Sequence, residues 1–170
     1  MVVAGYIGAR SVKWLQRIEL RREPWDGYFQ NTPYRLLAPH EKPGPGVGIA
    51  LSEVGLNTAI LLPEDGTRVP LGPVELRGYA MAGGGHEIAR VEISRDNGAS
   101  WLQATLLEDQ GRWAWRQWRA QVELPAGDHE IVVRAWDDAA NTQPKLSETV
   151  WNPKGCANSS WARIRLHASA

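Results

Sequence analysis

From about residue 47 onward, short runs of strand-forming residues recur and are separated by turn signals. In the run 88–93, Val91 and Ile93 alternate with Arg90 and Glu92, which is the two-residue period of a strand with one buried face. The runs that fit a strand cover residues 58–62, 74–80, 88–93, 101–107, 113–124, 131–136 and 161–167. About seven strands with no helical period between them predict a mainly β chain, folded as an immunoglobulin-like β-sandwich. Asp96-Asn97-Gly98 further predicts a tight hairpin turn.

Residues 1–39 have a different character. Val2, Val3 and Ile7 are strand formers, and residues 12–20 alternate well enough to predict a half-buried strand. Residues 25–37 are aromatic and interrupted by prolines, so this part of the chain cannot bury a core alone. Three prolines and two glycines within residues 39–46 indicate a linker. We therefore expect one unit at residues 1–39, a linker at residues 40–46 and a β domain at residues 47–170.

Composition limits the classes of partner. Nineteen basic and nineteen acidic residues give a formal net charge of zero, which argues against nucleic acid or an anionic membrane as the partner. The single cysteine, Cys156, excludes an internal disulfide framework. No apolar run approaches the roughly 20 residues of a membrane helix, and the first residues lack the basic start of a secretion signal. The compartment stays open: periplasmic for a bacterial chain with an upstream signal, cytoplasmic otherwise.

Several local motifs favour ordinary structural roles. Gly83-Gly84-Gly85 lacks the Lys and Ser/Thr of a phosphate-binding loop and predicts a bulge or turn. Asp137 and Asp138 lack the spacing of a calcium loop and predict a solvated turn capped by Asn141. The four histidines form no spaced pair of metal ligands, and no nucleophile elbow is present. The sequence therefore predicts no catalytic residue and no metal ligand in this chain.

Seven segments together resemble a known family. They are GARSVKWL (8–15), WDGYFQ (25–30), VELRGYAMAGGG (74–85), VEISRDNGASW (91–101), WAWRQW (113–118), RAWDDAANTQP (134–144) and VWNPKG…SSWARI (150–164). In this order and spacing they resemble the C-terminal part of sulfite oxidase-type molybdenum enzymes, a family that includes plant-type nitrate reductases. The resemblance implies that residues 1–39 are the end of an α+β molybdopterin-binding catalytic domain. It further implies that residues 47–170 are an immunoglobulin-like dimerisation domain of the E-set type.

The same resemblance implies two groups of site residues. The family's GARxVKW segment lies against molybdopterin, which points to Ser11, Val12 and Lys13 as cofactor-binding residues, with Ser where many relatives carry His. A lysine supplies a point charge for the phosphate tail of the cofactor. Arg10 either joins this basic surface or pairs with a carboxylate. Many sulfite oxidases read Trp-Asn-Leu-Arg-Gly where this chain has residues 151–155, so Lys154 is a substrate-binding candidate, with a solvated lysine as the alternative.

The resemblance also implies what lies elsewhere. The cysteine that ligates molybdenum in the family belongs to the catalytic domain upstream, and Cys156 does not match its motif. We expect the whole enzyme to be a homodimer that transfers an oxygen atom, with sulfite oxidised to sulfate. Its electrons would pass to a haem or cytochrome c-type acceptor. The cofactor is molybdopterin with molybdenum in the full-length enzyme, and we expect this chain alone to bind none. Met1 then reads as an artificial or accidental start inside a strand.

A second hypothesis is a free-standing immunoglobulin-like module that binds protein or carbohydrate through its tryptophans. Trp115 and Trp118 have opposite parity on one expected strand, so they face opposite sheet surfaces and one of them is available for an interface. A free module has no use for residues 1–39, so the behaviour of that segment separates the two hypotheses. We expect an isolated segment of residues 47–170 to be better behaved than the whole chain.

Overall fold

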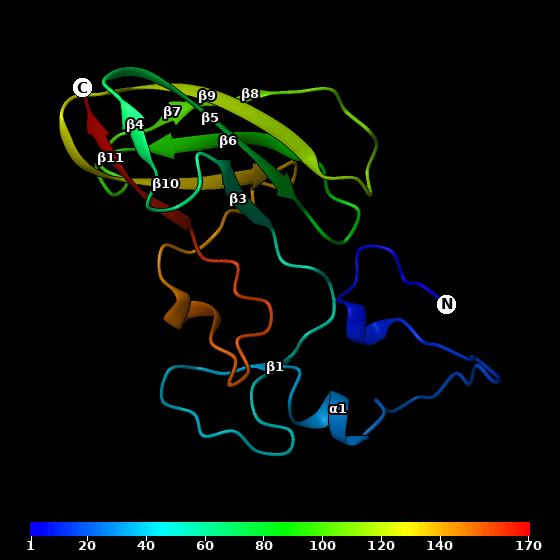
Figure 1. Ribbon diagram of the computed structural model, residues 1–170. Helices are drawn as coiled ribbons and strands as arrows, with labels where there is room; N and C mark the ends of the chain where they lie inside the picture. Colours follow the sequence, from blue (N-terminus) through cyan, green and yellow to red (C-terminus); the bar gives the residue numbers. More distant parts are fainter.

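The computed structural model describes residues 1–170 and places a β-sandwich above a less regular N-terminal part (Figure 1). No helix in it is both long and apolar enough to cross a membrane. The elements are η1 (Gly8–Arg10), α1 (Tyr28–Asn31), β1 (Arg35–Leu36), β2 (Ile49–Ala50), β3 (Asn57–Leu62), β4 (Arg68–Pro70), β5 (Gly72–Met81), β6 (Ile88–Ser94), β7 (Leu102–Gln103), β8 (Thr105–Leu106), β9 (Arg116–Leu124), β10 (Gly127–Asp137), η2 (Ser147–Val150) and β11 (Ala162–Ser169).

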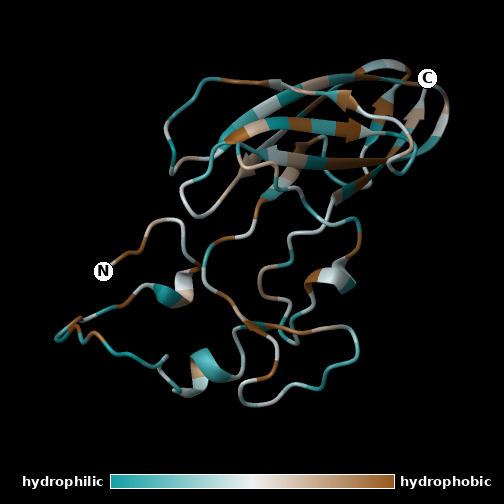
Figure 2. Cartoon of the chain, turned by 180° about the vertical axis from the view of Figure 1, so that it is seen from behind, coloured by the Kyte–Doolittle hydropathy of each residue, from teal (hydrophilic) through white to brown (hydrophobic).

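Two sheets form the sandwich. One has the strand order β4-β11-β10-β6-β7 and the other the order β3-β5-β9-β8. All neighbouring strands run antiparallel except β4, which pairs in parallel with β11. The colouring by hydropathy shows apolar and polar residues alternating along these strands (Figure 2). This alternation gives each sheet one face for the core and one for solvent, as the sequence predicts.

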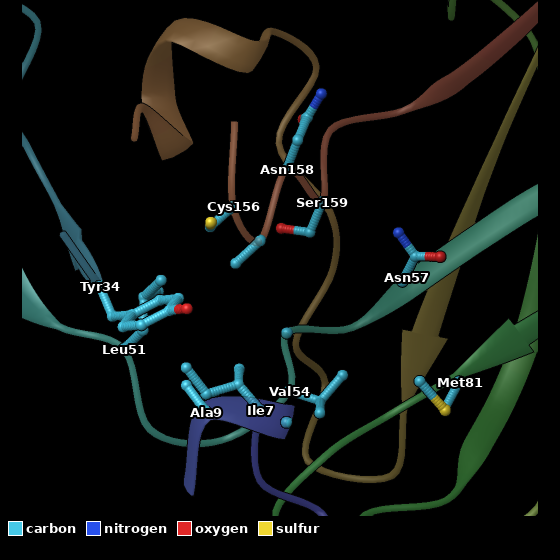
Figure 3. A pocket seen from close by; sticks show the side chains of 13 residues that line it. Ile7, Ala9, Tyr34, Leu51, Val54, Asn57, Met81, Cys156, Asn158 and Ser159 are labelled. Carbon is cyan, nitrogen blue, oxygen red and sulfur yellow. The ribbon is translucent and has the colours of Figure 1, made fainter. Parts of the chain in front are cut away.

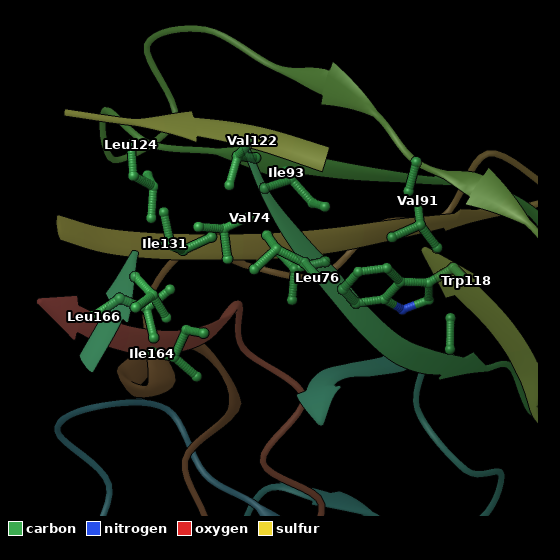
Figure 4. Packing of buried hydrophobic residues seen from close by; sticks show 14 of the residues in the cluster. Val74, Leu76, Val91, Ile93, Trp118, Val122, Leu124, Ile131, Ile164 and Leu166 are labelled. Atoms are coloured by element: carbon green, nitrogen blue, oxygen red, sulfur yellow. The ribbon is translucent and has the colours of Figure 1, made fainter. Parts of the chain in front are cut away.

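The core fills the space between the sheets (Figure 4). Sixteen buried residues from both sheets form one cluster, with Leu76, Val91 and Ile131 fully buried. Trp118 on β9 is also fully buried, and its Nε1 donates to Thr58 Oγ1 at 3.1 Å. The indole therefore adds its large apolar area to the core without leaving its N–H unpaired. The expected immunoglobulin-like sandwich is thus present, with more strands than the sequence predicts.

The run 101–107 is divided between the two sheets. β7 pairs with β6, whereas β8 pairs with β9. Between them, Ala104 is buried and its N–H donates to the Val91 carbonyl. The tight hairpin turn expected at Asp96-Asn97-Gly98 is a wider loop, because Ile93 pairs with Leu102 and residues 94–101 connect them. Trp113 precedes β9 rather than starting it.

The strands expected within residues 1–39 do not form. Residues 2–7 contribute one isolated bridge, between Tyr6 and Glu53, and residues 12–20 have no regular structure. Trp14 is 90% exposed and Leu20 is 98% exposed. A half-buried strand needs a neighbouring strand and a core to cover it, and residues 12–20 have neither in this structure. The prediction of a half-buried strand at residues 12–20 is therefore wrong.

The connection from β10 to β11 leaves the sandwich and returns to it. Residues 138–161 descend to the N-terminal part, where Trp151 forms an isolated bridge with Leu37 (Figure 1). Residues 40–46 lie in the loop between β1 and β2, which pair with each other. The division of the chain into two domains and a linker stays a prediction, and residues 138–161 lie beside both expected units.

Candidate functional site

A cavity lies between two chain segments that neighbour the predicted site residues. Its volume is about 370 Å³, and it is lined on one side by Ile7, Gly8 and Ala9 and on another by Cys156–Ser159. Tyr34 and Leu51 close it between these segments (Figure 3). Ser11–Lys13 follow the first segment after Arg10, and Lys154 precedes the second by two residues. The fold thus brings the segments next to the two predicted groups to one cavity, although Ser11, Val12, Lys13 and Lys154 themselves do not line it.

Ser11, Val12 and Lys13 differ in what they can still bind. The Val12 N–H donates to the Met1 carbonyl at 2.9 Å, and the Val12 carbonyl accepts from the Met1 amino group at 2.6 Å, so its backbone is already engaged. Ser11 Oγ accepts a long bond of 3.4 Å from the Val3 N–H, which leaves its own proton free to donate. Lys13 is exposed and makes no hydrogen bond or ion pair. Its ammonium and the Ser11 hydroxyl are the available donors of this segment.

Arg10 is a structural residue rather than a free cation. Its Nη1 donates to Gln30 Oε1 at 2.7 Å, while Nε and Nη2 both donate to the Leu51 carbonyl. The guanidinium therefore fastens the turn Gly8–Arg10 to α1 and to the residue after β2. Of the two alternatives for Arg10, the structure supports pairing, with a carbonyl and an amide in place of a carboxylate.

Asn152 organises the turn that carries Lys154. Its side chain is buried, with 2% of the residue exposed. Nδ2 donates to the carbonyls of Pro33 at 2.9 Å and Arg35 at 2.8 Å. Oδ1 accepts from the backbone N–H groups of Lys154 at 2.9 Å and Cys156 at 3.1 Å. Lys154 itself is exposed, and its ammonium has no partner. The sequence signal for Asn152 is the Asn152-Pro153 pair, which is typical of a turn.

Gln143 anchors the other end of residues 138–161 to the sandwich. It is buried, and its Oε1 accepts from the Ala135 N–H of β10 at 3.0 Å. Its Nε2 donates to the carbonyls of Ser159 at 3.0 Å and Ser160 at 3.2 Å. The segment that presents Lys154 is thus held by one buried amide at the sandwich and a second at the N-terminal part.

A group of tryptophans surrounds Arg134 on the outer face of the five-stranded sheet. The guanidinium carbon lies 3.7 Å from the ring centre of Trp101, 5.3 Å from that of Trp136 and 5.7 Å from that of Trp161. These distances are within the range of cation–π attraction. This cluster covers the outer side of the sheet and packs the loop 94–101 against it, since a Cβ on Gly98 would lie 2.8 Å from Trp161.

Glu92 neutralises this cluster. It accepts from Arg134 Nε at 2.7 Å and from Trp136 Nε1 at 2.8 Å. Burial of the carboxyl raises its pKa, but the hydrogen bonds from Trp136 and Arg134 and the positive charges of Arg134 and Arg90 outweigh burial. The pKa of Glu92 therefore lies below its ordinary value, and the carboxylate is charged at neutral pH.

Trp115 and Trp118 face opposite sides of the four-stranded sheet, as their parity predicts. Trp118 is fully buried, whereas Trp115 is 56% exposed and stacks on Tyr79 with ring centres 4.5 Å apart. Tyr79 is held in place by a hydrogen bond of 3.2 Å from its hydroxyl to Asn57 Oδ1. The outer face of this sheet therefore carries a stacked aromatic pair, of which Trp115 is the exposed member.

Two turns have the structural roles that the sequence favours, with one correction. Gly83–His86 is a turn in which Gly84 and Gly85 have positive φ. The turn after β10 is capped by Asp137 rather than by Asn141, and Asp137 is buried rather than solvated. Its carboxylate accepts from the N–H groups of Ala139 and Asn141, which explains its burial. No three His, Cys, Asp or Glu side chains gather so that they could hold a metal ion.

Comparison with known families gives one match. Residues 49–169 match the family described as Mo-co oxidoreductase dimerisation domain. Mitochondrial sulfite oxidase of Homo sapiens is 35% identical over 178 residues, which cover 99% of this chain and 33% of that protein. Sulfite oxidase of Arabidopsis thaliana is 35% identical, over 98% of this chain and 46% of that protein. The NADH nitrate reductase of Lotus japonicus is 33% identical, over 98% of this chain and 21% of that protein.

A solved structure has the same fold. The crystal structure of the sulfane dehydrogenase SoxCD from Paracoccus pantotrophus superposes with a TM-score of 0.75 at 20% sequence identity. The match covers 95% of this chain and 42% of that one. The sandwich and the N-terminal part together are therefore an arrangement found in a known protein. This chain spans a third of the length of the human relative and less than half of the plant sulfite oxidase.

Proposed function

We propose, for a chain that belongs to the Mo-co oxidoreductase dimerisation domain family, that it is the dimerisation region of a molybdenum oxidoreductase of sulfite oxidase type. One observation carries the proposal: the family match at residues 49–169 is continued by similarity to sulfite oxidases over 99% of the chain. The reaction we propose for the whole enzyme is oxygen-atom transfer to sulfite, which is thereby oxidised to sulfate. Similarity to nitrate reductases keeps nitrate as the second substrate to test.

Residues 1–39 are proposed to belong with a catalytic domain, residues 40–46 to be a linker and residues 47–170 to be the dimerisation domain. Support comes from the apolar side chains of the first segment, since Trp14, Ile18 and Leu20 are each at least 70% exposed. Exposed apolar side chains gathered on one segment are typical of a surface that contacts another protein part. A catalytic domain packed on this segment would cover them.

Molybdopterin is the proposed cofactor of the whole enzyme, and residues 11–13 fit it in part. Lys13 has a free ammonium and Ser11 a free hydroxyl proton, which suit an anionic phosphate group. Val12 has an exposed side chain, and its N–H is already bonded to the Met1 carbonyl. When bound, the cofactor supplies a molybdenum centre for oxygen-atom transfer. Ser11 and Lys13 would hold its anionic end, Lys13 as a point charge and Ser11 as a hydrogen-bond donor.

Lys154 is the proposed substrate-binding residue. Its ammonium is exposed and unpaired while its backbone N–H is fixed by Asn152. A lysine in such a turn attracts an oxyanion as a point charge but cannot form the two parallel bonds of an arginine. We therefore expect weaker oxyanion binding than an arginine would give at this position, and Lys154→Arg to increase it.

The chain itself is proposed to be catalytically silent. Its only cysteine, Cys156, is half-buried at the cavity and has no His, Cys or carboxylate set around it that could hold a metal. Molybdenum would then be ligated by a cysteine of the catalytic domain, and electrons would leave to a haem or cytochrome c-type acceptor.

The size of the natural product tests this reading. An antibody raised to residues 47–170 should detect a species far heavier than 18.9 kDa in native cells, and that species should contain molybdenum. A band at 18.9 kDa without molybdenum would reject the enzyme and favour the free-standing module. In that second case the exposed Tyr79–Trp115 stack is the platform to test for carbohydrate binding.

Homodimerisation is proposed to involve the aromatic pair on the outer face of the four-stranded sheet. Sedimentation equilibrium of the whole chain should give twice the mass of 18.9 kDa. Trp115→Ala should weaken the dimer at least about tenfold, since exposed tryptophans at interfaces contribute strongly to binding. Trp25→Ala is the matched control, because Trp25 is 61% exposed on the N-terminal part. Equal effects of the two substitutions would place the interface elsewhere.

A further inference from the structure

We infer that Asn152 is the positioning residue for Lys154: its side-chain amide shapes the turn that carries Lys154 and holds this turn against residues 33–35. The part of this inference that gives Lys154 an oxyanion rests on the proposed function. The positioning itself rests on the geometry around one buried amide.

The Asn152 amide uses its whole hydrogen-bonding capacity. A carboxamide has two N–H donors and an oxygen with two lone pairs. Nδ2 donates to Pro33 and Arg35, and Oδ1 accepts from Lys154 and Cys156. The donors therefore reach the N-terminal part, while the acceptor shapes the turn. No other side chain of this size can do both, because aspartate lacks the donors and leucine lacks both functions.

Few other bonds fix this turn. Gly155 donates its N–H to the Asn152 carbonyl at 2.9 Å, and Pro153 has no N–H to donate. Between the turn and residues 33–37, the remaining backbone bond runs from the Leu37 N–H to the Trp151 carbonyl at 2.9 Å. Loss of the Asn152 side chain would therefore remove the acceptor of the Lys154 and Cys156 N–H groups. It would also remove both side-chain bonds from the turn to the N-terminal part.

This arrangement matters for a lysine more than for most residues. The ammonium stands at the end of a flexible four-carbon chain, so its position is defined only if the backbone at Lys154 is fixed. Asn152 fixes the backbone N–H of Lys154 directly. It also fixes the turn relative to Pro33 and Arg35, which lie beside Tyr34 in the wall of the cavity. The charge of Lys154 thus has a defined place relative to the N-terminal part.

Three variants of the whole chain separate the two functions of the amide. Asn152→Ala removes donors and acceptor. Asn152→Asp keeps the acceptor for Lys154 and Cys156 but removes the donors to Pro33 and Arg35. Asn158→Asp is the matched control, because Asn158 makes the same kind of local turn but accepts only from Ser160.

Amide hydrogen exchange is the first measurement. In Asn152→Ala, the amides of Lys154 and Cys156 lose their acceptor and should exchange at least about tenfold faster. The Leu37 amide should do the same, because the contact that holds Trp151 beside it loses the bonds to Pro33 and Arg35. In Asn152→Asp, only Leu37 should exchange faster. Ile131 and Val133 in the core report global stability and should not change. Unchanged exchange at Lys154 and Leu37 in Asn152→Ala would overturn the inference. If Asn152→Ala loses protection throughout the chain, Asn152→Asp decides instead: faster exchange at Leu37 supports the inference, and unchanged exchange there overturns it.

Binding of inorganic sulfate is the second measurement, followed by the chemical shift of the Lys154 amide. Asn152→Ala should weaken sulfate binding at least about threefold, and Lys154→Ala should abolish the sulfate-induced shift at residue 154. Sulfate binding by Asn152→Ala equal to that of the unchanged chain would overturn the positioning of the charge. Absence of any sulfate response in the unchanged chain would reject the proposed function of Lys154, while the exchange data would still decide the positioning by Asn152.

Discussion

Replacement of Gly78 by alanine tests how closely the Trp118 indole packs against β5 in the core. Gly78 lies on β5, faces the core and pairs with Trp118 of β9. A Cβ at this position would lie 2.0 Å from the Ala59 carbonyl oxygen and 2.3 Å from Cζ2 of the Trp118 indole. The indole occupies the space that any side chain at residue 78 would need.

Two effects of Gly78→Ala have opposite signs. Alanine lowers the conformational entropy of the unfolded chain, which favours folding by about 0.4–1 kcal/mol. Overfilling a packed core costs about 1–3 kcal/mol, and displacement of the indole from Thr58 loses a hydrogen bond that contributes about 1 kcal/mol. The clash is with a backbone oxygen of β3 as well as with the ring, so rotation of a side chain cannot relieve it. We therefore expect a net loss of about 2–3 kcal/mol in the free energy of unfolding.

Urea unfolding followed by tryptophan fluorescence and circular dichroism measures this loss. The midpoint should fall with an unchanged slope, and the thermal midpoint should drop by about 4–12 °C. Gly8→Ala is the matched control, because nothing lies within 4 Å of a Cβ built there. It should leave stability unchanged or raise it slightly. A Gly78→Ala midpoint equal to that of Gly8→Ala would refute the close packing of Trp118 against β5.

Three further substitutions follow from the buried polar groups. Glu92→Gln should cost about 1–3 kcal/mol at pH 7. Because the pKa of Glu92 is lowered in the folded state, the contribution of the carboxylate is present above its ordinary value of 4.5 and is lost as the pH falls through the lowered pKa. The gap between the two proteins should therefore narrow below pH 4.5. A gap that stays constant over this range in urea titrations would contradict the ion pairing. Gln143→Leu should cost about 2–4 kcal/mol and speed exchange at the Ala135 amide, its donor partner; unchanged exchange there would be the contrary result. Thr58→Val should cost about 1–3 kcal/mol by leaving the Trp118 N–H unpaired in the core, measured by thermal unfolding, and equal thermal midpoints would show that this N–H finds another partner.

The sandwich could be predicted from sequence because alternation reports burial directly. β5, β6 and β9 each have one face in the core, and their apolar residues recur at every second position. The division of residues 101–107 between two sheets could not be predicted, because it depends on which neighbours lie beside Ala104 in the folded chain. Residues 12–20 show the converse: their pattern suits a strand, but a strand also needs a partner.

The candidate site divides in the same way. The resemblance to a family predicts Ser11, Lys13 and Lys154, and in the structure the hydroxyl proton of Ser11 and the two ammonium groups have no partner. The engagement of Arg10 and of the Val12 backbone could not be read from sequence, since both depend on contacts with Leu51 and Met1. The role of Asn152 could not be predicted for the same reason, because its side-chain N–H groups donate to Pro33 and Arg35, more than a hundred residues away.

The place of β11 between β4 and β10 has a consequence for synthesis on the ribosome. β10 is complete once residue 137 has emerged, but its neighbour follows only after residues 138–161. At about 5–20 residues per second, this interval lasts roughly one to five seconds. Throughout it, one edge of β10 is unpaired and the apolar side chains of Ile131 and Val133 lack part of their cover, which exposes the nascent chain to association with its neighbours. A chaperone that binds extended apolar segments would find its target in β10 during that interval.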